Sequence, residues 1–193
     1  YFFFFYGFYQ YRNELYRLKV NTGELSEVKY SPSLDSRYSS SLAVVGDELF
    51  IFGGRGNKRG KQEFNSYFYY ELCAINLKTG DSRRLWKNGN SNDMMIMASS
   101  MYFEPSDSSF YAVSLKDGGV LWKVSMNDSV WTKISKPINN KIKYQDCELS
   151  FYAAPAHSKL YLVIDKILSD HTHDVNIYSI NTPLLNDSEI AQE

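Results

Sequence analysis

The chain has 193 residues, of which 44% are apolar and 16% aromatic, and its 21 basic and 22 acidic side chains leave a formal net charge of −1. So small a net charge excludes a general attraction of the whole chain to nucleic acid or to an anionic membrane surface. The two cysteines, Cys73 and Cys147, are too few for a disulfide scaffold, and Cys73 alternates with apolar neighbours as a small buried side chain would. The length suits one globular domain or a large piece of one.

The opening YFFFFYGF is too short to cross a bilayer and lacks the basic leader of a signal peptide, so no membrane insertion is expected. Strand-like segments then recur at intervals of about 50 residues, and each runs into a polar turn. They are LYRLKVNTGEL from Leu15, LCAINLKTGDS from Leu72, LWKVSMNDSVW from Leu121 and VNIYSINTPLL from Val175. With the apolar runs that precede them, these segments predict blade-like units at about residues 1–30, 38–87, 94–135 and 146–185, followed by a polar tail at 186–193.

The apolar residues of these units alternate with period two, and no stripe with the 3.6-residue period of a helix occurs. Gly46, in the short turn VGDE, suits the positive φ angle of a tight hairpin. We therefore predict an all-β fold, namely a β-propeller of four-stranded antiparallel blades with about four blades visible. A β-sandwich is the alternative, but it does not predict the recurrent order of apolar strand, turn and aromatic residue.

The second unit carries the most specific motif. Its SLAVVGDELFIFGG, followed after a loop by LCAINLKTGD, resembles the kelch repeat, in which two glycines end the second strand and a Tyr and a Trp follow on the next two strands. Glycine at a strand end allows a sharp exit and a close backbone approach, which is the role expected for Gly53 and Gly54. The resemblance also implies aromatic side chains that pack between neighbouring blades. The residues in these positions are Tyr16, Trp86, Trp122 and Trp131.

The quinoprotein type of propeller repeat, in which a Thr-Gly turn precedes a Trp, is the second family that the segments resemble. Kelch propellers generally have about six or seven blades, so the resemblance implies that this chain is the C-terminal part of a larger propeller, with the remaining blades upstream. Any targeting signal would then lie upstream of residue 1. An exported protein is favoured slightly over a cytoplasmic one.

The long segment at residues 55–67 carries Arg55, Lys58, Arg59 and Lys61 against a single acid, Glu63. One interpretation is a solvated, mobile loop, which its glycines would favour; Gly60→Ala should then cost less than about 1 kcal/mol. The sharper interpretation is an anion-binding site for carboxylate or sulfate groups, because a guanidinium pairs such groups through two hydrogen bonds. The order of residues is not that of a phosphate-binding P-loop.

The run DHTHD places His171 and His173 two residues apart between carboxylates. In an extended segment both imidazoles would face the same side, as a metal site requires. The stretch at residues 165–174 is expected to be an exposed loop, however, where short His/Asp clusters are common. No metal, no other cofactor and no catalytic residue is therefore predicted, and the two histidines are kept only as candidate binding residues.

These observations favour a non-catalytic recognition module that binds a protein, a peptide or a glycan through the loops on one face of a propeller, within an exported or sensor protein. Loops held by a rigid frame are where binding residues are usually found. A nucleic-acid partner is not expected. The alternative is an enzyme on the kelch frame, either a metal-dependent oxidase with a fold like that of galactose oxidase or a sugar-modifying mutarotase.

Overall fold

The computed structural model describes residues 2–5, 10–89, 95–114, 118–138, 147–154, 159–168 and 172–181. The chain divides into two compact units, Tyr1–Met95 and Ile96–Glu193. Strands account for the regular structure in both units, and no α-helix occurs in the described ranges. Over the same ranges no helix is long and apolar enough to span a membrane. The prediction of an all-β fold is confirmed.

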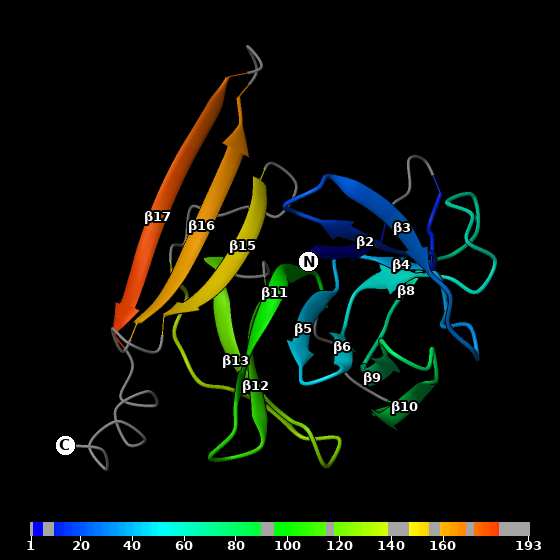
Figure 1. Ribbon diagram of the computed structural model, residues 1–193. Helices are drawn as coiled ribbons and strands as arrows, with labels where there is room; N and C mark the ends of the chain where they lie inside the picture. The colour runs from blue at the N-terminus through cyan, green and yellow to red at the C-terminus, as the bar shows by residue number, and fades with distance from the viewer. Residues whose placement is uncertain are drawn as a thin grey trace. The chain divides into compact units, whose positions relative to one another are not determined.

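The first unit contains three groups of hydrogen-bonded strands (Figure 1). The first group runs in the order β1 (Phe2–Phe5), β2 (Leu15–Lys19), β3 (Glu24–Val28). The second runs in the order β10 (Ser82–Lys87), β9 (Glu71–Asn76), β6 (Glu48–Phe52), β5 (Ser41–Val45), with all neighbours antiparallel. The third is a small sheet in the order β4 (Arg37–Tyr38), β7 (Arg55–Gly56), β8 (Tyr67–Phe68).

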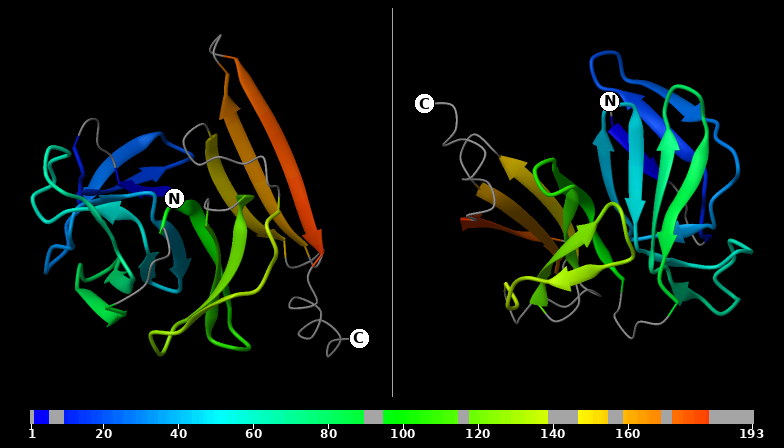
Figure 2. Two further views of the ribbon diagram at one scale, coloured as in Figure 1. Left: turned by 180° about the vertical axis from the view of Figure 1, so that it is seen from behind. Right: turned by 90° about the horizontal axis from the view of Figure 1, so that it is seen from below.

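The second unit repeats the same antiparallel up-and-down order (Figure 2). One group is β11 (Met97–Glu104), β12 (Ser109–Ser114), β13 (Val120–Ser125), β14 (Trp131–Lys133). The other is β15 (Cys147–Ala154), β16 (Lys159–Ile167), β17 (His173–Asn181).

The core of the first unit lies around its two central strands, β6 and β9. Leu49, Ile51, Cys73 and Ile75 pack together with Leu15 of β2, and each is at most 1% exposed. Runs of consecutive apolar residues, rather than strict alternation, mark strands that are buried on both faces. Cys73 is buried, as the sequence predicts.

The buried Cys73 thiol should resist alkylation in the folded chain. Burial, and the nearby Glu71 carboxylate, raise the pKa of Cys73 to about 12, so little thiolate forms at pH 8. Cys147 is partly exposed. Iodoacetamide at pH 8 should therefore add one group to the native chain, at Cys147, and two groups in urea, as counted by mass spectrometry. Native modification of Cys73 would contradict the packing of β9.

The glycine pair at the end of β6 adopts backbone conformations that other residues avoid. Gly53 has a φ of 71° and Gly54 a φ of 95°. A β-carbon added to Gly54 would stand 2.2 Å from the Ser40 hydroxyl oxygen and 2.9 Å from the Tyr38 carbonyl oxygen. The chain therefore needs glycine here because it turns sharply and passes close to the backbone ahead of β5.

The three tryptophans differ in burial. Trp86 is 8% exposed and meets the edge of the Phe52 ring, with the ring centroids 6.0 Å apart. Trp122 and Trp131 are only partly buried, which is less than the enclosed position that the repeat predicts for them. Trp131 begins the short edge strand β14 of its group, and Trp122 lies on the neighbouring strand β13. Tyr16 on β2 is also partly buried.

The segment at 165–174 differs from the predicted loop. Strand β16 continues through Ile167, and β17 begins at His173, so that Ile167 and His173 are directly paired. Valine and isoleucine side chains favour this extension because β-branched residues fit a pleated surface. The described part of 165–174 is thus mostly strand.

Candidate functional site

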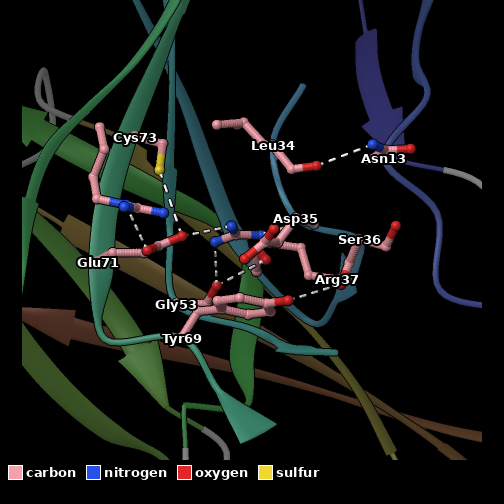
Figure 3. Close-up of polar contacts among 11 residues, drawn as sticks. Asn13, Leu34, Asp35, Ser36, Arg37, Gly53, Tyr69, Glu71 and Cys73 are labelled. Atoms are coloured by element: carbon pink, nitrogen blue, oxygen red, sulfur yellow. Dashed lines mark hydrogen bonds and ion pairs between the residues drawn. The ribbon is translucent and has the colours of Figure 1, made fainter. Parts of the chain in front are cut away.

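A buried ion pair supports the small sheet β4-β7-β8 (Figure 3). Arg37 of β4 donates a hydrogen bond of 2.6 Å to Glu71 at the start of β9, and the two side chains are 2% and 1% exposed. The guanidinium of Arg84 lies 2.8 Å from the second Glu71 oxygen, and its own side chain is 47% exposed. One carboxylate therefore holds two arginines, and the cluster links β4, β9 and β10.

Further contacts enclose the Arg37 guanidinium (Figure 3). It lies 3.9 Å from the centroid of the Tyr69 ring and donates hydrogen bonds to the carbonyl oxygens of Asp35 and Gly53. The Tyr69 hydroxyl donates to the carbonyl oxygen of Ser36, 3.2 Å away, and burial raises the pKa of this phenol. Tyr69 directly follows β8, so the same contacts fix both ends of the small sheet.

The loop between β7 and β8 is built around Asn57, which is 4% exposed. Its carboxamide nitrogen donates to the Lys61 carbonyl oxygen at 2.7 Å, and its carboxamide oxygen accepts from the backbone nitrogens of Arg59 at 3.0 Å and Lys61 at 3.4 Å. The Gly60 carbonyl oxygen accepts a hydrogen bond of 2.9 Å from the backbone nitrogen of Tyr11. An internal asparagine and the preceding chain therefore both hold this loop through hydrogen bonds.

The backbone around Gly60 leaves less room for a side chain than the sequence predicts. Gly60 has a φ of 67°, and an added β-carbon would stand 2.8 Å from the Tyr11 carbonyl oxygen. We now expect Gly60→Ala to lower the free energy of unfolding by about 1–3 kcal/mol, because it adds backbone strain and a clash. Urea denaturation measures the loss. Gly23→Ala is the control, since Gly23 has a similar φ of 68° but no atom within 4 Å.

Residues of this loop line a widely open surface cavity of about 370 Å³. Its lining residues are Asn57, Lys58, Arg59, Phe64, Asn65 and Tyr67. Two of the four basic residues that the sequence singles out, Lys58 and Arg59, thus line one cavity, together with aromatic and carboxamide side chains that the sequence analysis did not select.

The other two basic residues have different surroundings. Arg55 donates a hydrogen bond of 2.8 Å to the Ser66 hydroxyl, and its guanidinium lies 5.6 Å from the centroid of the Phe68 ring. The Lys61 ammonium lies 3.6 Å from the Glu63 carboxylate. Neither residue lines the cavity.

Of the two candidate histidines, His171 lies outside the described residues. His173 is exposed, and its Nδ1 lies 2.7 Å from an Asp165 carboxylate oxygen. Within the described ranges no three His, Cys, Asp or Glu residues are grouped as a metal site requires.

Comparison with known proteins gives information on the fold alone. No known family model matches the chain, and no curated protein matches it significantly. The fold is similar to that of a solved structure described as Bacteroides ovatus xyloglucan PUL GH43B, with a TM-score of 0.61, 10% identity and 94% of this chain covered. This chain spans only 37% of that one. The N-terminal domain of Nup159 also aligns, at 17% identity, over 94% of this chain and 44% of the Nup159 chain. Its TM-score of 0.41 is too low to show a shared fold.

The first similarity points to a propeller, because the GH43 structure is a five-bladed β-propeller. At 10% identity it says nothing about activity. The up-and-down order of β5, β6, β9 and β10, and again of β11 to β14, is the order of strands in a propeller blade.

Proposed function

We propose that the chain is part of a kelch-like β-propeller that serves as a non-catalytic recognition module, and that it binds a glycan in the cavity between β7 and β8. The observation that carries the proposal is the cavity itself. Its volume of about 370 Å³ falls within the range of small-ligand sites, about 300–1,000 Å³. A loop that is tied internally and to neighbouring segments loses little conformational entropy when a ligand binds.

The lining of the cavity favours a glycan. Tyr67 is 41% exposed and offers a flat aromatic face at the surface, whereas Phe64, 37% exposed, has the Arg59 guanidinium 4.3 Å from its ring centroid. A sugar ring can pack its C–H groups against such a face, as other flat groups do. The carboxamide of Asn65 and the ammonium of Lys58 supply donors for sugar oxygens.

Binding without catalysis is supported by the types of side chain in the lining. Glycoside hydrolysis commonly needs a pair of carboxylic acids beside the bond that breaks. Among the residues that the structure describes, no carboxylate, imidazole or thiol lines the cavity. Glu71 is closed in by two arginines at 1% exposure, so it is not available to a ligand.

A glycan array followed by calorimetry on the full chain tests the proposal. We expect Tyr67→Ala to weaken binding of the best glycan by about three- to tenfold, the value of one aromatic contact. The matched control is Tyr152→Ala, because Tyr152 is 54% exposed on β15 and does not line the cavity. Binding to no glycan, or equal losses in the two variants, would contradict the proposal.

A further inference from the structure

Arg59 differs from every other arginine of the chain. The others all contact an oxygen atom of a described residue: Arg12 contacts Glu14, Arg17 Ser26, Arg37 Glu71, Arg55 Ser66, Arg83 Glu48 and Arg84 Glu71. Among the residues that the structure describes, the Arg59 side chain has no such oxygen partner. Its guanidinium instead lies 4.3 Å from the centroid of the Phe64 ring, within the cavity lining.

Stacking on Phe64 restricts the orientation of this guanidinium without using its hydrogen-bond donors. A guanidinium that lies over a ring keeps its N–H groups in its own plane, directed away from the ring. Such a group is prepared to bind a planar anion through two parallel hydrogen bonds. The Arg59 guanidinium is therefore held in position for binding and does not move freely in solvent.

The positive charge of the cavity is also not compensated by any described residue. Lys58 and Arg59 both line it, and neither forms an ion pair with a described residue. Glu63 is the only acid in the segment 55–67, and it is paired with Lys61, which does not line the cavity. A neutral sugar would leave both cations without an anionic partner.

We propose that the cavity selects an acidic sugar, whose carboxylate or sulfate group binds Arg59 and Lys58 while its ring lies against Tyr67. This inference rests on the proposed glycan-binding function and adds the chemical class of the ligand. The Phe64 face is already covered by Arg59, whereas Tyr67 is 41% exposed and meets the edge of Tyr69 at a centroid distance of 5.0 Å. Tyr67 is therefore the aromatic surface left for the sugar, and Asn65 offers its carboxamide to ring hydroxyls.

Matched probes separate this inference from the proposed function. Calorimetry on the full chain would compare oligogalacturonate with the same oligomer fully methyl-esterified, and would add a sulfated disaccharide and a phosphotyrosine peptide. We expect at least one acidic glycan to bind about tenfold more tightly than the neutral ester, because hydrogen bonds to a charged acceptor are stronger than those to a neutral one. The preference should fall as salt is added.

Site variants then assign the preference to the cavity. Arg59→Gln should reduce the ratio of acidic to neutral affinity to near one, with an unchanged melting temperature since Arg59 is exposed. Lys29→Gln removes an equal charge at an exposed residue outside the cavity and should leave the ratio unchanged. An Arg59→Gln variant that keeps the full preference would overturn the inference.

Three further results would decide between the acidic-sugar inference and the glycan-binding proposal. Equal affinity for acidic and neutral glycans would overturn the selectivity while leaving the glycan-binding function intact. Binding of no glycan at all would remove both proposals. Tighter binding of the phosphotyrosine peptide than of any acidic glycan would replace the sugar by a peptide as the ligand.

Discussion

Glu71→Gln should lower the free energy of unfolding by about 3–5 kcal/mol, because it leaves the buried Arg37 guanidinium without its counter-charge. Arg37 is 2% exposed, so water cannot take the place of the carboxylate. The stacked ring of Tyr69 and the carbonyl oxygens of Asp35 and Gly53 solvate this charge only in part. Urea denaturation followed by tryptophan fluorescence measures the change.

Two comparisons make this prediction specific. Asp47→Asn breaks an ion pair with Lys78 whose side chains are 55% and 73% exposed, and it should cost at most about 1 kcal/mol. The double variant Arg37→Met with Glu71→Leu removes both buried charges together and should be more stable than Glu71→Gln alone. A loss below about 1 kcal/mol for Glu71→Gln would mean that water reaches the pair.

Gly54→Val should destabilise the fold by about 3 kcal/mol or more, since a clash and a backbone strain act at the same residue. The φ of 95° disfavours any β-branched side chain, and the new β-carbon would stand 2.9 Å from the backbone oxygen of Tyr38. The Gly54 backbone also has little freedom to move. Its nitrogen donates to the Met95 carbonyl oxygen, and its carbonyl oxygen accepts from the Tyr69 nitrogen, both at 2.9 Å.

The variant Gly46→Val separates the effect of backbone strain from the effect of the steric clash. Gly46 has a φ of 59° in the β5–β6 turn, but no atom lies within 4 Å of an added β-carbon, so only the strain term applies. We expect Gly46→Val to cost about 1–2 kcal/mol, clearly less than Gly54→Val in the same thermal or urea melt. Equal losses would show that the close approach at Gly54 is relieved by movement of Ser40 and Tyr38.

The basic residues of the β7–β8 loop show how much of the candidate site can be predicted from the local sequence. Four cations within 55–67, with one acid, direct attention to this loop. Which of them face a common space depends on Asn57, whose carboxamide turns the chain so that Lys58 and Arg59 line the cavity and Lys61 does not. Phe64 and Tyr67 are visible in the same stretch as aromatic residues interleaved with basic ones, and that signal could have included them in the site.

No comparable pattern in the sequence predicts the Arg37–Glu71 ion pair. The two residues are 34 positions apart, and each stands in an ordinary strand-edge context in the sequence. Only the pairing of β4 with β7, and the position of Tyr69 after β8, bring the arginine to the start of β9. Likewise, the resemblance implies that Trp122 and Trp131 pack between neighbouring blades, whereas the structure leaves both only partly buried.

The sequence by itself determined the all-β class and the need for glycine at Gly46, Gly53 and Gly54. These features depend on side-chain alternation and on φ angles, which neighbouring residues set. The tertiary structure decided the buried charge cluster, the tethering of Gly60 to Tyr11 and the side chains that line the cavity. The charge cluster and the Gly60–Tyr11 tether depend on contacts between residues distant in the chain, whose free energy arises only when folding removes them from water together. The lining of the cavity depends on the hydrogen bonds that Asn57 makes within its own loop.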